Sequence, residues 1–172
     1  SAVPLLREMV ERNDSPLAKL HALWTLKVLG ELEDKQLLAA LKDVDSHLRE
    51  SAALLAESVA GMRHLILGLI RDENKRVRIQ AILSMRSPLE NEHPDNHEMA
   101  PVLSKAAQVD GSDSWMRIAF FSHEPNWNEA LIVMTAPLPP DWVNKDFLKS
   151  GVEMIGRSGN LQACKWLLPQ LR

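Results

Sequence analysis

The sequence contains a single cysteine, no tyrosine and few glycines. One cysteine excludes an intramolecular disulfide framework, and 7 glycines among 172 residues exclude a collagen-like chain. No apolar run approaches the roughly 20 residues of a membrane-spanning helix, and the longest, residues 52–60, is interrupted by Glu57. Ser1–Pro4 lacks the basic start and apolar stretch of a signal peptide. These absences favour an ordinary globular chain.

An excess of positive charge is also absent. Lysine and arginine number 20 against 23 acidic residues, which gives a net charge of −3 and a pI near 6.1. Proteins that bind nucleic acid or anionic membranes through a diffuse field need the opposite balance. With 45% hydrophobic and 25% charged residues, the composition predicts a single domain over residues 1–172.

Signals for β-strands are nearly absent, because no Asn-Gly or Asp-Gly turn separates two alternating segments. Helical periodicity is widespread: Leu48, Ala52, Leu55 and Val59 lie on one stripe of a helix. Ser15-Pro16 is typical of an N-cap followed by proline at the first helical position. The fold class is therefore predicted to be all-α. The expected helices cover residues 3–12, 15–29, 33–42, 46–60, 62–71, 75–86, 97–109, 113–122, 126–135, 141–157 and 160–171.

A pattern recurs along these helices, in which an acidic turn is followed by a helix with an early basic residue. The second helix begins Leu48-Arg49-Glu50-Ser51-Ala52 in one copy and Val77-Arg78-Ile79-Gln80-Ala81 in the next. The basic positions 19, 49, 78 and 117 are separated by 30, 29 and 39 residues, and the longest interval contains the proline-rich residues 87–96. Such a period indicates a repeat architecture, because stacked helix pairs form the continuous core that one pair cannot.

The acidic turn and the hydrophobic-Arg-x-x-Ala segment resemble the short HEAT-like repeats of roughly 30 residues that also occur in phycobilisome-lyase-like proteins. The resemblance covers residues 13–122 and implies a right-handed α-solenoid of HEAT-like helix pairs, with divergent C-terminal helices over residues 123–172. Gly159–Leu168 looks like part of an ankyrin repeat, but the Thr-Pro-Leu-His segment and the 33-residue period are missing. A divergent terminal helix pair is the simpler interpretation.

Leu20–Leu26 and the repeats after it are similar to helical regions of large predicted bacterial membrane-bound dehydrogenases, where a propeller precedes and a c-type cytochrome follows. Cys164-Lys165-Trp166 is not the Cys-x-x-Cys-His site of such a haem. The resemblance implies a spacer within a larger extracytoplasmic redox protein and does not carry dehydrogenase activity over to this chain. An array excised from a longer one should leave an apolar face open on its first helix. The residues concerned are Leu5, Leu6, Met9 and Val10.

The basic column has two interpretations: a surface that grips an acidic partner, or a structural ladder. Its members are Lys19, Arg49, Arg78 and Arg117, and the turn acids expected to pair with them are Asp45, Asp72 and Asp113. The ladder is favoured. Exposed pairs of this kind contribute only about 0–1 kcal/mol each, so their value lies in fixing the register between repeats.

Other candidates have an ordinary structural explanation beside the functional one. The cluster Arg71, Lys75, Arg76 and Arg78 is either a phosphate-binding patch or a solvated helix end, and His93–Glu98 is either a metal site or a polar loop. Cys164 is interpreted as a buried small hydrophobe. Trp24, Trp127, Trp142 and Trp166 are interpreted as packing residues.

The sequence predicts a non-enzymatic interaction or spacer module, with a protein partner or a neighbouring domain of the same chain, and no catalytic residue, metal or cofactor. The candidate interaction residues are Arg76, Arg78, Trp115 and Arg117. The alternative is a HEAT-like nucleic-acid-processing enzyme. Trp115, Asp113 and Arg117 resemble the aromatic, acidic and basic groups that HEAT-like DNA glycosylases place on a concave surface.

Overall fold

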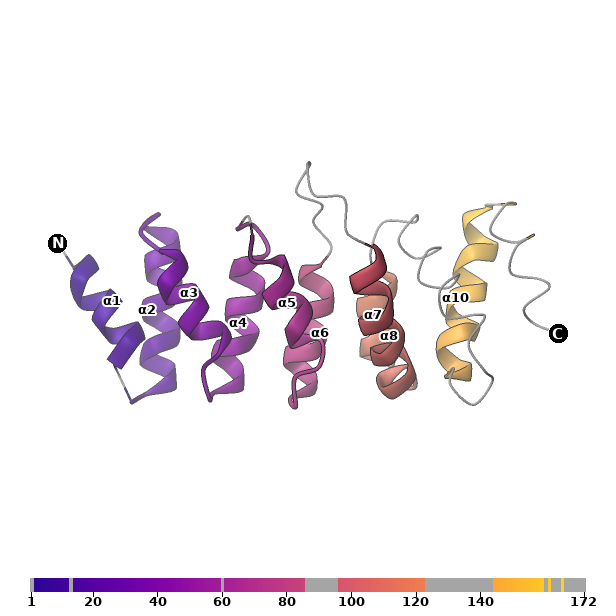
Figure 1. The fold of residues 1–172 in the computed structure, drawn as a ribbon, viewed down its shortest axis with the longest axis horizontal. Helices are drawn as coiled ribbons and strands as arrows, with labels where there is room; N and C mark the ends of the chain where they lie inside the picture. The colour runs from indigo at the N-terminus through magenta and orange to yellow at the C-terminus, as the bar shows by residue number, and fades with distance from the viewer. Residues whose placement is uncertain are drawn as a thin grey trace. The chain divides into compact units, whose positions relative to one another are not determined.

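The structure is a computed structural model that describes residues 2–12, 14–59, 61–85, 96–122 and 144–159, together with Leu161 and Lys165. All regular secondary structure in these residues is helical, so the predicted all-α fold class is confirmed for them (Figure 1). The chain, which we expected to be one domain, divides into two compact units, Ser1–Leu89 and Glu90–Arg172.

The described helices follow most of the predicted ranges. In the first unit they are α1 (Val3–Arg12), α2 (Pro16–Val28), α3 (Asp34–Leu41), α4 (Ser46–Ala56), α5 (Arg63–Leu69) and α6 (Lys75–Ser84). In the second unit they are α7 (Asn96–Asp110), α8 (Ser114–Phe121) and α10 (Lys145–Ser158). The helix predicted over residues 126–135 lies outside the described residues, as does the one over 160–171 except at Leu161 and Lys165.

Helix α4 ends four residues earlier than predicted. Val59, which we expected on its apolar stripe, lies in a turn after Ala56. Its amide donates to the Ala56 carbonyl at 3.0 Å, a bond to the third preceding residue that tightens the chain away from α-helical geometry. Gly61 follows with a φ of 79°, a conformation that glycine adopts without strain.

Five described helices begin with a side chain that caps their first turn. Ser15, Asp45, Asn74, Asp113 and Asn144 have extended backbone and accept hydrogen bonds from amides two or three residues further on. These bonds satisfy donors that have no partner within the helix. The caps are separated by 30, 29, 39 and 31 residues. Asn144 therefore continues the local period into α10, which the sequence had assigned only to a divergent region.

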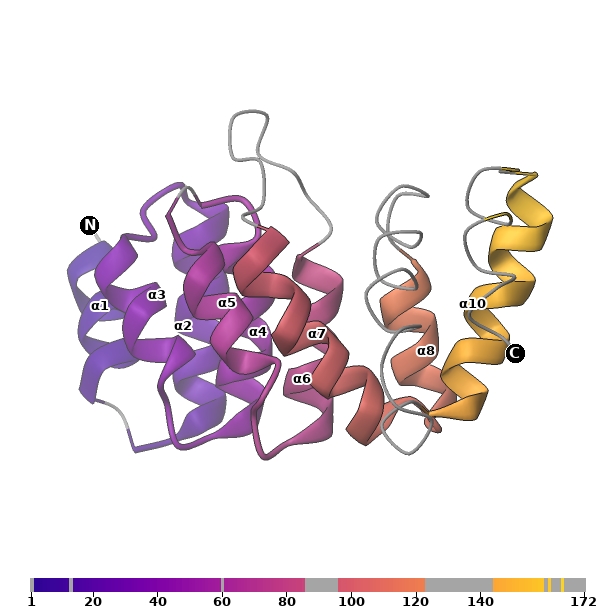
Figure 2. The ribbon, with the colours of Figure 1, turned by 45° about the vertical axis from the view of Figure 1, so that its right-hand side comes forward.

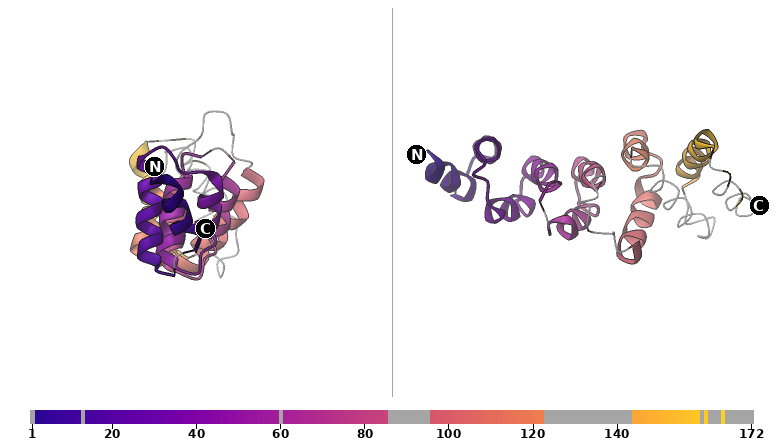
Figure 3. Two further views of the ribbon diagram at one scale, coloured as in Figure 1. Left: turned by 90° about the vertical axis from the view of Figure 1, so that its left-hand side faces the viewer. Right: turned by 90° about the horizontal axis from the view of Figure 1, so that it is seen from above.

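The helices of the first unit pack as consecutive pairs. Helix α1 contacts α2, α3 contacts α4, α5 contacts α6, and α4 also contacts α2 and α6. Seen from above, α1, α3 and α5 form one layer of this unit and α2, α4 and α6 form the other (Figure 3). The turned view in Figure 2 shows the same two layers. Each helix of the unit thus buries one face against the opposite layer.

The even-numbered helices of this unit bury equivalent positions. The seventh residue after the cap is alanine in all three, at Ala22, Ala52 and Ala81, and none is more than 1% exposed. A methyl group leaves room for neighbouring helices to approach closely. Larger buried residues fill the spaces around these alanines. They are Leu23, Leu26, Leu37, Leu48, Ile66, Ile70, Val77 and Ile82.

The core of the second unit is aromatic where α8 meets α10. Phe147 is fully buried. Its ring lies edge-on to that of Phe120, with centroids 5.2 Å apart, and is stacked on that of Phe121 at 4.9 Å. Both arrangements suit the charge distribution of aromatic rings. Phe147 therefore anchors the first turn of α10 against α8.

Gly111, in the turn between α7 and α8, makes this approach possible. A Cβ atom there would overlap the Ala107 carbonyl oxygen and lie 2.9 Å from the Cβ atoms of Asn144 and Phe147. Real Cβ contacts are essentially never this short. The start of α10 therefore occupies space that any other residue at position 111 would fill.

The apolar face of α1 is partly open, as expected. Leu5 is 68% exposed and Met9 is also exposed, whereas Leu6 is half-buried and Val10 is buried. Only one side of this helix is therefore covered within the first unit.

Candidate functional site

The three arginines of the basic column adopt the same conformation. Each occupies the fourth position after its cap, and its Nη1 atom donates to two carbonyl groups of the turn before its own helix, at 2.7–3.0 Å. The acceptors are Asp43 and Val44 for Arg49, Asp72 and Glu73 for Arg78, and Gly111 and Ser112 for Arg117. The arginines therefore hold the turns together.

Arg49 also binds the following turn. Its Nε and Nη2 atoms donate to the two carboxylate oxygens of Asp72 at 2.8 Å each, and Nη2 lies 3.5 Å from Glu73. All five N–H groups of the guanidinium thus have acceptors. The side chains of Arg49 and Asp72 are only 9% and 8% exposed. Lys19 makes the preceding rung of this ladder, with its Nζ atom 2.8 Å from a carboxylate oxygen of Asp43.

The charges of the ladder are stabilised by their surroundings. Burial raises the pKa of Asp72, but hydrogen bonds from Arg49 and the Asn74 amide outweigh it and bring the pKa below its ordinary value of 3.8. The same balance lowers the pKa of Asp43, with Lys19 as the principal donor. The hydrogen bond to Asp72 raises the pKa of Arg49. These groups stay ionised at neutral pH, as a structural ladder requires.

The prediction that Asp45 belongs to the ladder is wrong. Its carboxylate caps α4 by accepting from two amides of the first turn, at 2.9 and 3.3 Å. Asp43 is the ladder residue, and its second oxygen accepts from the Asp45 amide at 2.9 Å. The ladder role of Asp72 is confirmed by its contact with Arg49, while Asp113 caps α8.

The four predicted interaction residues lie on helices of different units. Arg76 and Arg78 are on α6, and Trp115 and Arg117 are on α8. Trp115 is 68% exposed. Arg76 pairs with Glu50 of α4 at 3.2 Å, and the other two arginines bind turn carbonyls. Two members of the predicted phosphate-binding cluster, Arg76 and Arg78, are thus engaged within the fold.

An exposed apolar surface that the sequence analysis missed lies on α2 and α4. Leu17, Trp24 and Val28 recur at helical spacing along one side of α2 and are 62%, 37% and 83% exposed. Leu54 of α4 occupies the same position after its cap as Trp24 and is also exposed. These four residues are the α2–α4 patch. The sequence signal that could have revealed the patch is that α2 has apolar residues on both of its sides, of which only one can face the core.

The rim of the α2–α4 patch is basic and polar. His21, Lys27 and His47 are exposed on the same two helices. The Nζ atom of Lys27 donates to the Ser58 hydroxyl at 3.2 Å, which links the end of α2 to the residues after α4. An apolar centre with a polar rim is the usual anatomy of a protein-binding surface.

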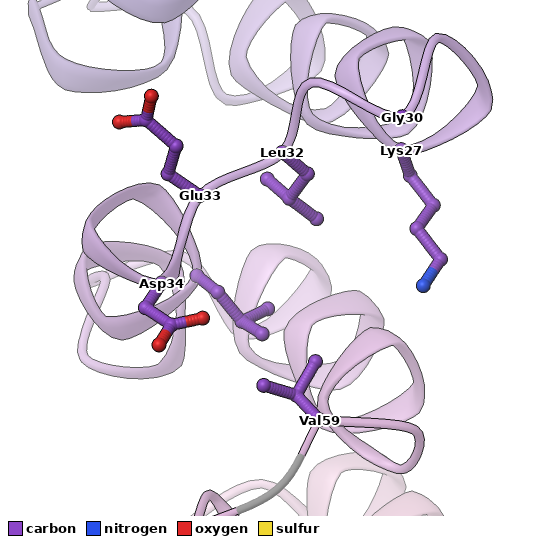
Figure 4. A pocket seen from close by; sticks show the side chains of 7 residues that line it. Lys27, Gly30, Leu32, Glu33, Asp34 and Val59 are labelled. Atoms are coloured by element: carbon purple, nitrogen blue, oxygen red, sulfur yellow. The ribbon is translucent and has the colours of Figure 1, made fainter.

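A cavity of about 210 Å³ lies where the connection from α2 to α3 passes the residues after α4. Its lining consists of Lys27, Gly30, Leu32, Glu33, Asp34, Leu37 and Val59. In Figure 4, Lys27 and Asp34 lie on opposite sides of the space, and Leu32 and Val59 lie between them. The Glu33 carboxylate points away and lies 2.7 Å from Arg7. The cavity therefore presents one cation and one carboxylate above an apolar floor.

Gly30 directs the chain into this cavity. It has a φ of 70°, and its amide donates to the Lys27 carbonyl while the Glu31 amide donates to Leu26. This pair of bonds is the Schellman motif that ends helices at glycine. The motif turns the chain so that Leu32 and Asp34 line the cavity.

Several candidates lie outside the described residues. These are His93, Cys164, Trp127, Trp142 and Trp166, and the side chains of residues 96–100 are likewise outside. In the described part of the chain, no group of three or more histidine, cysteine or acidic side chains could hold a metal ion. Within that part, no helix is both long and apolar enough to cross a bilayer.

Comparison with known proteins finds no match: no family model fits the chain, and no curated protein or solved structure is significantly similar to it.

Proposed function

We propose that the chain is a right-handed α-solenoid of HEAT-like helix pairs that serves as a non-enzymatic protein-interaction or spacer module. The consecutive pairing of α1–α6 supports the architecture, as do the regular spacing of the caps and the rungs formed by Lys19 and Arg49. Repeats of this kind contact mainly their neighbours and present extended surfaces to partners.

The observation that carries the function is the contrast between the ladder and the α2–α4 patch. The polar groups of Arg49 and Asp72 are fully used inside the fold, whereas Leu17 and Val28 remain largely exposed. Burying one such side chain contributes about 1.5–3 kcal/mol. The occupant of the patch is accordingly a protein partner or a neighbouring domain of the same polypeptide.

A site-specific photo-crosslinking experiment tests this proposal. A photoreactive amino acid placed at Leu17 or Val28 should capture one defined protein segment in cells that make the whole polypeptide. Unlabelled chain should compete, and the variant Leu17→Asp with Val28→Asp should not. Lys42, exposed on the other layer, is the control position. Capture at Leu17 no greater than at Lys42 would contradict the proposal.

The nucleic-acid alternative receives less support from the same residues. The Asp113 carboxylate accepts from the Trp115 and Met116 amides at 2.9 and 3.1 Å, and Arg117 binds two turn carbonyls. Both polar side chains are thus engaged in building the start of α8. Fluorescence anisotropy with duplex DNA at low salt distinguishes the two functions, since micromolar binding that weakens steeply with salt favours the enzyme.

A further inference from the structure

The cavity beside α3 is lined by two exposed charged side chains, Lys27 and Asp34, that can accept further polar partners. Lys27 has three N–H donors, of which Ser58 accepts one. Asp34 has no hydrogen-bond or ion-pair partner for its carboxylate among the residues that the structure describes. We propose that this cavity binds a free α-amino acid with an aliphatic side chain, as the zwitterion.

Each of the two charges has a complementary group on the zwitterion. Lys27 lies in the last turn of α2 and receives the ligand carboxylate, while Asp34 lies in the first turn of α3 and receives the ammonium group. Both residues are on the helix end whose dipole favours their charge. Both side chains are exposed, and a ligand with a single charge contacts only one of them, whereas the zwitterion contacts both.

Volume limits the occupant further. Sites for drug-sized ligands usually span roughly 300–1,000 Å³, and this cavity has about 210 Å³. A volume of this size suits a single amino acid better than a nucleotide or a peptide segment. The floor of Leu32, Leu37 and Val59 offers only apolar contacts, which favour an aliphatic side chain over the hydrogen atom of glycine.

Titration of the whole chain with L-leucine, followed by two-dimensional NMR of its amides, tests this site. We expect saturable shifts at the lining residues with a Kd of about 1 mM, the range expected for a ligand this small. Isoamylamine lacks the carboxylate, 4-methylpentanoate lacks the ammonium group and glycine lacks the side chain. Each should bind wild-type protein at least about fivefold more weakly than L-leucine.

Charge-neutralising variants assign the two roles. Lys27→Gln and Asp34→Asn should each weaken L-leucine binding about tenfold. Asp34→Asn should leave 4-methylpentanoate binding unchanged, and Lys27→Gln should leave isoamylamine binding unchanged. Lys42→Gln and Asp14→Asn make the same changes at exposed positions outside the cavity and should alter nothing.

Two results would overturn the site. One is the absence of saturable shifts with wild-type protein up to about 20 mM L-leucine. The other is equal weakening of 4-methylpentanoate and L-leucine by Asp34→Asn, because Asp34 would then not receive the ammonium group. The comparison among ligands on wild-type protein requires no variant to fold. Neither result bears on the α2–α4 patch.

Discussion

The turn before α6 and the turn before α8 share one local design but bind their neighbours differently. Both have a capping residue at the helix start and an arginine four residues later that holds two turn carbonyls. They differ two residues before the cap, where the first has Asp72 and the second has Gly111. Asp72 binds the guanidinium of Arg49, whereas the bare backbone at Gly111 lies against the first turn of α10.

This difference shows that the position two residues before the cap can join a turn to a neighbouring helix in two ways. A carboxylate at that position makes a directed, charged link that needs an arginine on the neighbouring helix. Glycine makes an undirected link that depends on shape alone, since Asn144 and Phe147 fill the space of its missing side chain. The shared cap and arginine conformation therefore fix the turn, and the second residue before the cap determines how it joins its neighbour.

The largest effect is expected when the ion pair between Arg49 and Asp72 is broken. Asp72→Ala leaves a nearly buried guanidinium without its carboxylate and should lower the free energy of unfolding of the first unit by about 3 kcal/mol. Urea unfolding and amide hydrogen exchange in α4 and α6 measure the loss. Glu73→Ala, at a side chain that is 87% exposed, is the control and should have little effect. If both variants lose equal stability, the ion pair with Asp72 does not contribute specifically to the stability of the first unit.

A smaller effect is expected where Gly111 packs against the first turn of α10. Gly111→Ala forces the turn away from Asn144 and Phe147 and should destabilise the second unit by about 2 kcal/mol. Hydrogen exchange should accelerate in α8 and α10 without change in α4. Gly156→Ala, within α10 where a new Cβ meets nothing within 4 Å, is the matched control and should stabilise by about 0.5–1 kcal/mol. If both substitutions stabilised the second unit, the close packing of Gly111 against α10 would be contradicted.

Acidification should weaken the ion pairs of Asp43 and Asp72, and near neutral pH it has the smallest effect of the three tests. Folding lowers the pKa values of Asp43 and Asp72 below 3.8, so their stabilisation is complete above that pH. It is lost as the pH falls through the folded-state values. Urea midpoints of wild-type protein should therefore fall below pH 4 more steeply than those of Asp72→Asn. Parallel pH profiles would show that the Asp72 pair contributes no pH dependence.

Local signals in the sequence predicted much of the framework. The helix ranges follow from apolar periodicity, and the repeat of Arg49, Arg78 and Arg117 indicated a shared structural role. The choice between Asp43 and Asp45 was beyond sequence reasoning, because two carboxylates two residues apart can each cap or bridge until the turn conformation is known.

Tertiary features were harder to foresee. Asn144 is the fifth cap of the series, but Leu148 occupies the position that arginine holds in three other copies, so the motif no longer marked the helix. The candidate cavity depends on how the chain after Gly30 meets Val59, which is 29 residues further along the sequence. The α2–α4 patch was missed because the sequence does not show which apolar side of a helix is buried and which is exposed.

The longest cap spacing is the 39 residues between Asn74 and Asp113. This interval is ten residues longer than the preceding one, yet the caps and arginines on either side keep the same geometry. The free-energy penalty of a longer connection grows only logarithmically with its length. A boundary between helix pairs can thus accommodate a longer connection while the framework on either side is unchanged.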